Sequence, residues 1–132
     1  MMKIKIGHLY PDLLNLYGDR GNIACMKKRC EWRGIEAEVQ AFQITDQVDF
    51  SDLDIVLLGG GSDREQMLVC EKLKTIQPDF KAYIEDYGTV IAVCGGYQLL
   101  GHYYDTEQGR IEGLSLVDLY TEQGSPRLIP NI

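Results

Sequence analysis

Two short apolar runs that end in glycines constrain the fold of this chain more than any other feature. They are DIVLLGGG at residues 54–61 and GTVIAVCGG at residues 88–96. The first run, apolar up to its glycines, is typical of a strand that a parallel sheet buries on both faces, and the second is predicted to be a further strand. The chain is therefore predicted to build its core around a parallel sheet.

The segments around these runs alternate between strand and helix patterns. Further strands are predicted at residues 3–9, 35–42 and 113–120, and helices at residues 22–33, 63–87 and 96–104. Pro78 should split the long helical segment, because proline fits a first helical turn and disrupts an interior. Strands that alternate with helices form a parallel sheet with right-handed crossovers. The predicted fold class is α/β, a flavodoxin-like three-layer sandwich with a mainly parallel sheet.

Apolar residues at helical spacing should share one side of the first predicted helix. They are Ile23, Met26, Cys30 and Trp32. Asn22 is a candidate cap for this helix and Gly34 a candidate stop, so the helix should begin within a residue or two of Gly21.

Length and charge limit the classes of partner. The 132 residues, 45% of them hydrophobic, suit one globular domain over residues 1–132. A net charge of -7 without a Lys and Arg cluster makes nucleic acid and anionic membrane surfaces poor partners. No signal-peptide pattern and no run of 18 apolar residues occurs, so a cytoplasmic location without membrane insertion is expected.

The cysteines and histidines give little support for a metal site. Four cysteines are present, Cys25, Cys30, Cys70 and Cys94. Their spacing matches neither a CxxC motif nor a dense secreted framework, so they are predicted to be thiols. His8 and His102 are the two histidines, and no tight cluster of ligands surrounds either in sequence. No zinc site is expected.

Cys94 stands in the pattern of a nucleophile elbow. Small residues two positions before it, Ala92, and two positions after it, Gly96, allow a strand to turn sharply into a helix. The thiol would project at the tip, where unpaired N–H groups of the helix favour the thiolate. A buried core cysteine is the alternative, and it is the favoured interpretation of the other three cysteines, which lie in helical patterns without flanking glycines.

The triple glycine at residues 59–61 follows a strand that should end at the same edge of the sheet as Cys94. GGGSDREQ lacks the Gly-Lys-Ser/Thr of a Walker motif and the GxGxxG pattern, so no nucleotide cofactor is expected. Glycine N–H groups beside a nucleophile suit an oxyanion hole. Gly60 or Gly61 would supply one donor and Gly95 the other.

LLGGGSDREQ at residues 57–66 and AVCGGYQLLG at residues 92–101 together resemble the class I glutamine amidotransferases of the cobyric-acid-synthase-like branch. The opening GHLYPDLLNLYGDRGN, residues 7–22, is similar to glutaminase subunits that work with a Mur-ligase-like partner of the MurT type. The resemblance implies hydrolysis of glutamine through a thioester on Cys94, without a cofactor. The ammonia would pass to the partner, which uses ATP to amidate the D-glutamate carboxyl of lipid II.

The resemblance also assigns two substrate-binding residues. Gln98 matches the glutamine of the CxGxQ motif, and Arg127 in PRLIPNI falls where the family carries a basic residue near the site. Pro130 replaces the glycine expected in this last stretch. The family holds a catalytic His, followed two positions later by an acidic residue, well downstream of the cysteine, and the chain ends at Ile132 without either. A C-terminal part is therefore expected to be missing, and the 132 residues alone to be close to inactive.

Neither histidine of the chain is a good substitute for the missing base. His102 lies eight residues after Cys94, which corresponds to a separation of roughly 12 Å along one helix. His8 closes the first strand and is better explained as an interior or loop-edge residue.

Two further interpretations remain open. The first is a non-catalytic or redox-sensing cysteine-elbow domain of the DJ-1 type that acts by protein interaction, for which Asp12 would be the acidic residue near the first strand. The triple glycine together with Gln98 favours the amidotransferase. The second is a flavodoxin-like ligand-binding domain without chemistry, which explains the sheet and leaves the elbow unexplained.

Overall fold

The computed structural model describes residues 2–14, 19–122 and 124. Its elements in chain order are β1 (Lys3–Leu9), α1 (Asp19–Trp32), β2 (Glu36–Phe42), β3 (Ile55–Leu58), α2 (Asp63–Thr75), α3 (Gln77–Glu85), β4 (Thr89–Ala92), α4 (Gly95–Leu100), β5 (Tyr103–Thr106) and β6 (Gly109–Glu112). The first four predicted strands and the first predicted helix are confirmed, each within a few residues of its expected bounds.

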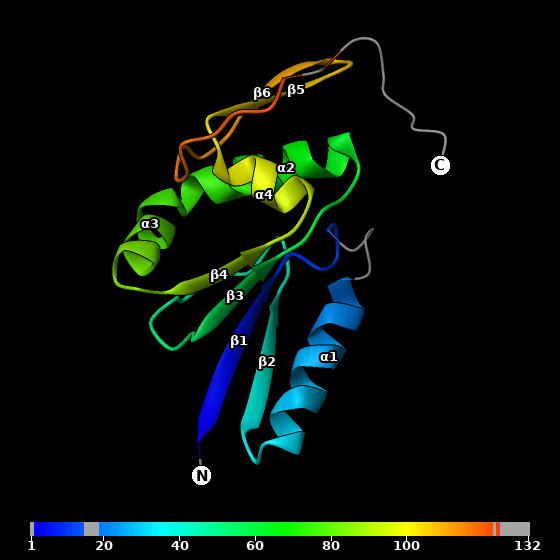
Figure 1. Cartoon of the computed structure of the whole chain (residues 1–132). Helices are drawn as coiled ribbons and strands as arrows, with labels where there is room; N and C mark the ends of the chain where they lie inside the picture. The colour runs from blue at the N-terminus through cyan, green and yellow to red at the C-terminus, as the bar shows by residue number, and fades with distance from the viewer. Residues whose placement is uncertain (1, 15–18, 123, 125–132) are drawn as a thin grey trace.

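The first four strands of the chain form one parallel sheet in the order β2-β1-β3-β4. α1 lies against one face of this sheet, beside β2, and α2, α3 and α4 cover the other face (Figure 1). The helices cover different faces because the chain adds β2 on one side of β1 and β3 and β4 on the other, as right-handed crossovers require. The predicted flavodoxin-like three-layer sandwich is confirmed.

The main core lies between the sheet and the group of three helices. Val56 and Leu58 of β3 belong to it, together with Leu73, Phe80 and Leu99 from the helices above. Each of these side chains is fully buried. Alternate residues of a strand point to opposite faces, so the uninterrupted apolar run of β3 serves both faces of the sheet.

The second face is covered more thinly. The α1 residues Ile23, Met26 and Cys30 are half-buried, as expected of the side that faces the sheet. Trp32, predicted to join them, is 69% exposed, so that prediction was wrong. It is the last residue of α1, where the helix ends and the chain turns at Gly34, which has a φ of 69°.

The helical segment after β3 is divided as predicted. α2 begins with a capping box, in which the Ser62 side chain accepts from the Glu65 N–H and the Glu65 carboxylate accepts from the Ser62 N–H. α3 follows after one residue and carries Pro78 in its first turn, where the missing N–H costs nothing.

The chain after Leu100 differs from the prediction. The helix predicted to run to residue 104 ends at Leu100, and an antiparallel hairpin of β5 and β6 follows. Gly101 has an extended backbone, and a Cβ there would collide with Leu119. Gly101 is thus a helix stop, as glycine often is, and its packing against Leu119 requires that it have no side chain.

The strand predicted at residues 113–120 is also absent from the structure. Backbone N–H groups of Leu114 and Leu116 donate instead to the carbonyl oxygens of Leu99 and Leu100, at 2.9 and 2.8 Å. Carbonyl groups in the last turn of a helix have no partner within the helix. The segment therefore satisfies the end of α4 rather than extending the sheet beside β4.

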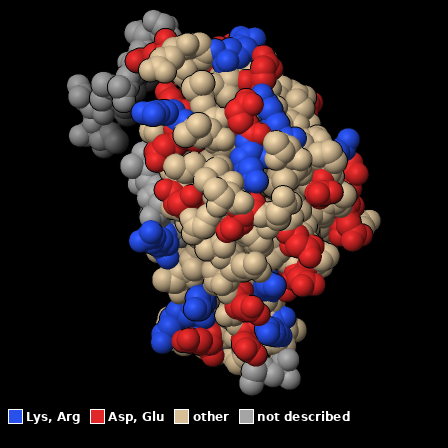
Figure 2. Space-filling model, turned by 180° about the vertical axis from the view of Figure 1, so that it is seen from behind, with Lys and Arg blue, Asp and Glu red and all other residues tan. Residues whose placement is uncertain are grey.

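Charged side chains of both signs are intermixed on the face shown in Figure 2, and Lys and Arg form no continuous stripe there. Several of these charges pair at the surface, as Lys28 does with Glu31. Among the described residues, no helix combines the length and the apolar character needed to cross a membrane.

Candidate active site

Cys94 occupies a strained turn between β4 and α4. Its backbone angles are φ 54° and ψ -116°, and it is the N-cap of α4. A residue other than glycine adopts these backbone angles only at a cost of about 1–3 kcal/mol, which the surrounding structure must offset. The residue is exposed although its neighbours Gly95 and Gly96 are buried. The predicted nucleophile elbow is confirmed.

Gly96 brings the triple glycine against this elbow. A Cβ on Gly96 would collide with the carbonyl oxygens of Leu58 and Gly59, which end β3 and begin the glycine loop. The Val93 N–H donates to the same Leu58 carbonyl at 2.9 Å, which extends the ladder between β3 and β4 by one residue. Direct backbone contact thus joins the two motifs that the sequence placed at one edge of the sheet.

Gln66 packs beneath the first turn of α4. Its side-chain amide lies where a Cβ of Gly95 would be, so only glycine fits at residue 95. The sequence interpretation did not single out Gln66. The available signal is its spacing in α2, where the buried side chains are Gln66, Val69, Cys70 and Leu73, so that a glutamine stands at a core position of the helix. A buried amide is expected to have hydrogen-bond partners.

The hydrogen bonds of the glycine loop distinguish its two candidate donors. The Gly61 N–H donates to Gln66 Oε1 at 3.2 Å. The Gly60 N–H has no acceptor among the described residues. Gly95 is the first residue of α4, a position whose N–H has no partner within the helix. Gly60 and Gly95 are therefore the donors that remain available for an oxyanion.

Gln98 lies four residues after Cys94 in the six-residue α4, and it is half-buried. Residues four apart share one face of a helix, so Gln98 belongs to the face of α4 that carries the elbow. Arg127 lies outside the described residues, and its assignment stays a prediction.

His102 is engaged away from the elbow. Its ring nitrogens lie 3.0 Å from Ser115 Oγ and 3.0 Å from Asp118 Oδ1. The prediction that it shares one helix with Cys94 was wrong, because α4 ends at Leu100. Its role in the structure is to tie the segment after β6 to the end of α4.

His8 is buried in the sheet, with 4% of its surface exposed. Burial, and secondarily the charge of Arg20, lowers its pKa, so the imidazole stays neutral near pH 7. β3 separates its strand from β4, and two strand spacings amount to about 10 Å. Within the part of the chain that the structure describes, neither histidine is therefore placed as the partner of Cys94.

The other cysteines are thiols in ordinary surroundings, as predicted. Cys70 is buried in α2, its Sγ donates to the Glu112 carbonyl at 3.1 Å, and burial raises its pKa. Cys25 is exposed and Cys30 half-buried on α1. Only Cys94 combines exposure with a strained backbone.

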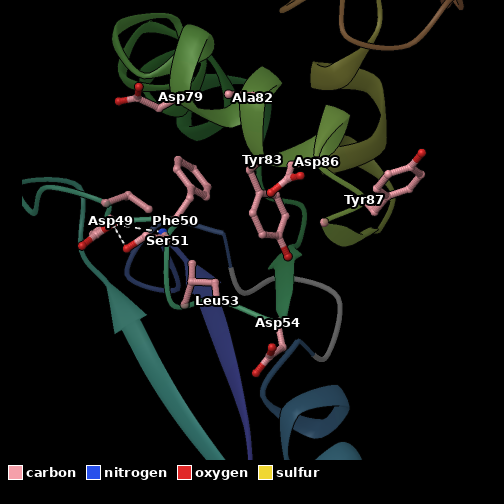
Figure 3. A pocket seen from close by; sticks show the side chains of 12 residues that line it. Asp49, Phe50, Ser51, Leu53, Asp54, Asp79, Ala82, Tyr83, Asp86 and Tyr87 are labelled. Carbon is pink, nitrogen blue, oxygen red and sulfur yellow. Dashed lines mark hydrogen bonds between the residues drawn. The ribbon is translucent and has the colours of Figure 1, made fainter.

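A cavity of about 600 Å³ lies at the opposite edge of the sheet, where β3 and β4 begin. Figure 3 shows Phe50 and Leu53 on one side of it and Tyr83 of α3 on the other. Two of its carboxylates already accept backbone N–H groups, Asp54 from Lys5 and Asp49 from Ser51. The cavity lining has no cysteine, and the exposed Cys94 thiol lies at the other edge of the sheet.

A doubly wound sheet that presents a cysteine on a strained elbow, next to free glycine N–H groups, is the framework of an enzyme that transfers acyl groups through a thioester. The comparisons with known proteins specify the family. The model of the CobB/CobQ-like glutamine amidotransferase domain matches residues 5–132. The chain therefore belongs to the CobB/CobQ-like glutamine amidotransferases, as the sequence motifs predicted.

Curated relatives agree with this family. The chain is 41% identical over 133 residues to the lipid II isoglutaminyl synthase (glutamine-hydrolyzing) subunit GatD of Staphylococcus aureus (strain N315), covering 100% of this chain and 55% of the relative. The GatD subunit of Streptococcus pneumoniae (strain ATCC BAA-255 / R6) is 40% identical over 132 residues, covering 98% and 51%. Cobyric acid synthase of Clostridium botulinum (strain Okra / Type B1) is 32% identical over 92 residues, covering 65% and 18%. The chain spans about half the length of the GatD relatives.

Proposed function

We propose that this chain is the glutamine-hydrolysing part of an amidotransferase and that Cys94 is its nucleophile. The observation that carries the proposal is the strained backbone of Cys94, held against the glycine loop by Gly96. Such strain persists only where the surrounding structure maintains it, and it clusters at reactive sites.

In the proposed reaction, the Cys94 thiolate attacks the side-chain carboxamide carbon of glutamine. Negative charge develops on the carbonyl oxygen, and the N–H groups of Gly60 and Gly95 stabilise it. The tetrahedral intermediate expels ammonia once the nitrogen is protonated, leaving a γ-glutamyl thioester. Water then hydrolyses the thioester to glutamate and frees the thiol. Gln98, and Arg127 by family resemblance, would hold the substrate.

The identity of the partner rests on the resemblance to the GatD subunits. By this resemblance the ammonia passes to a Mur-ligase-like partner of the MurT type, which uses ATP to amidate the D-glutamate carboxyl of lipid II. We also propose that residues 1–132 are one domain of a glutaminase whose triad histidine and acid come from a further segment. Support comes from the extra length of both relatives and from the positions of His8 and His102.

The redox-sensing alternative is not favoured. A cysteine-elbow sensor of the DJ-1 type requires an acidic side chain next to the thiol, and Asp12 was the candidate. Asp12 Oδ2 instead accepts from the Ile44 N–H, at 3.3 Å, in the loop after β2.

The test is ammonia release from glutamine by two forms of the protein. The 132 residues alone should be close to inactive, because neither His8 nor His102 is placed to protonate the leaving nitrogen. A form extended by a C-terminal segment that brings a histidine to Cys94, combined with the ligase-like partner, should turn over glutamine. Cys94→Ala should abolish this turnover.

Two results would overturn parts of the proposal. No turnover by the extended form with its partner would argue against the amidotransferase function. Robust, Cys94-dependent turnover by the 132 residues alone would show that the base lies within them, and His8 would be the first residue to substitute.

A further inference from the structure

Gln66 is an unusual residue in the core of this protein. Of the described residues, it and His8 are the two buried polar ones apart from tyrosines. Both ends of its amide are used: Oε1 accepts from the Gly61 N–H at 3.2 Å, and Nε2 donates to the Tyr104 hydroxyl at 2.9 Å. A leucine would fill similar space without an amide to desolvate. The question is therefore what the amide does there.

We propose that Gln66 is a positioning residue that holds the oxyanion hole in shape, an inference that rests on the proposed glutaminase function. Three consecutive glycines have wide conformational freedom, and an oxyanion hole works only if its donors are fixed before the reaction. Gln66 fixes the loop by accepting the Gly61 N–H. The bond anchors the peptide that follows Gly60 and leaves the Gly60 N–H as the free donor.

The same side chain supports the second donor. The Gln66 amide fills the space beside Gly95, and no Cβ separates the two. α2 and α4 pack together at this point (Figure 1). One side chain thus contacts both segments that supply the proposed donors, so its position sets the distance between the glycine loop and the elbow.

Tyr104 of β5 fixes which way the amide points. Tyr104 is 2% exposed, and burial is the main reason that the pKa of its hydroxyl is raised to about 12, so the hydroxyl stays neutral at any working pH. By accepting from Nε2, it leaves Oε1 directed at Gly61. The β5–β6 hairpin, which the sequence did not predict, thereby reaches the proposed site through a chain of two hydrogen bonds.

The test compares two electrophiles that react with Cys94 in the full chain. The Cys94 thiolate displaces chloride from the chloromethyl carbon of a chloroketone analogue of glutamine, so that a C–S bond forms as the C–Cl bond breaks, with the ketone oxygen in the oxyanion hole. Iodoacetamide alkylates the same sulfur with loss of iodide and has no glutamine side chain to place its carbonyl. The ratio of the two second-order rate constants therefore reports the oxyanion hole separately from the reactivity of the thiol.

Gln66→Leu should lower this ratio by about tenfold or more, because removing one oxyanion donor outright costs about 100- to 1,000-fold and a displaced donor should cost a part of that. Iodoacetamide alone should react within about twofold of the wild-type rate. Gln66→Glu should restore most of the ratio, because its carboxylate accepts from both the Gly61 N–H and the Tyr104 hydroxyl. Its charge beside the thiolate should slow both electrophiles alike. Tyr104→Phe should give a smaller loss of about threefold.

Cys70 is an internal control for folding. It is 1% exposed and stays unlabelled by iodoacetamide in any variant that folds. If Gln66→Leu exposes Cys70, the other two variants test the proposal instead. Gln66→Glu must keep most of the wild-type ratio, and Tyr104→Phe must lower the ratio by about threefold. An unchanged ratio in a variant that protects Cys70 would overturn the positioning role. If the chloroketone labels Cys94 of the wild-type protein no faster than it labels Cys25, that result would instead overturn the glutaminase proposal itself.

Discussion

The two edges of the parallel sheet differ in what they offer a substrate. The carboxyl edge holds an exposed thiol, a strained backbone and glycines in direct contact. The amino edge has an open cavity of about 600 Å³, with aromatic and acidic residues in its walls and no cysteine. Close backbone packing around an exposed thiol, rather than volume, distinguishes the carboxyl edge of this sheet. This distinction agrees with the general rule that such sheets bind ligands beyond the carboxyl ends of their strands.

The largest difference between the edges should appear in catalysis. In the extended, partnered form, Cys94→Ser should lower glutamine hydrolysis by about 1,000-fold or more, since a serine hydroxyl is a much weaker nucleophile than a cysteine thiolate in a site built for the thiolate. Tyr87→Ala at the amino edge should leave the rate within about twofold, because this side chain is 95% exposed beside the cavity. Ammonia release measures both. A large loss from Tyr87→Ala would show that the cavity participates in the reaction.

The close packing of the carboxyl edge should appear in stability. Gly96→Ala should lower the free energy of unfolding by about 2–3 kcal/mol, because its Cβ meets backbone oxygens of Leu58 and Gly59 that have little room to move. Gly21→Ala is the matched control, since nothing lies within 4 Å of a Cβ there. In helix α1 that change should stabilise by about 0.4–1 kcal/mol. Urea unfolding gives both values, and equal effects would contradict the packing account.

The capping box at the start of α2 helps to hold Gln66 in place. Removing it should lower the free energy of unfolding by less than Gly96→Ala does. Ser62→Ala removes the acceptor for the Glu65 N–H and should cost about 1 kcal/mol of unfolding free energy. Ser62→Thr keeps a hydroxyl and should recover most of this loss. Both variants are compared by the urea midpoint. A loss from Ser62→Thr as large as from Ser62→Ala would show that the side-chain bond is not the cause.

The smallest expected effect concerns His8. Its pKa in the folded protein is lowered below the ordinary 6.5 by burial, so the unfolded chain binds the proton more readily than the folded protein. The stability contributed by the neutral imidazole is therefore complete above pH 6.5 and is lost as the pH falls below it. Urea midpoints at pH 7.5 and 5.5 should differ less in His8→Gln than in the wild type. An equal pH dependence in both proteins would contradict the conclusion that burial lowers the pKa of His8.

The sequence predicted the parts of the fold that depend on local rules. The strands β3 and β4 are contiguous apolar runs, Pro78 marks the start of α3, and the small residues around Cys94 permit the elbow. The hairpin of β5 and β6 was missed because α4 ends early, before Gly101, which packs against Leu119. Such contacts between distant residues leave no periodic trace in the sequence.

The candidate site also contains residues that local motifs identified and one residue that only the folded structure reveals. Cys94 and the glycines were identified because their motifs are contiguous. Gln66 was missed because its hydrogen-bond partners lie 5 and 38 residues away, so that its role appears only when α2, α4 and β5 are assembled. The choice between Gly60 and Gly61 likewise required the bond that Gln66 makes.

The most direct measurement of the central claim is peptide mapping by mass spectrometry after treatment with the chloroketone analogue of glutamine near neutral pH. The account predicts one adduct, on Cys94, whose formation slows when L-glutamine is added, while Cys25, Cys30 and Cys70 stay largely unmodified. Labelling of exposed Cys25 to the same extent as Cys94, or labelling of Cys94 that glutamine does not slow, would contradict the assignment of Cys94 as the nucleophile of a glutaminase.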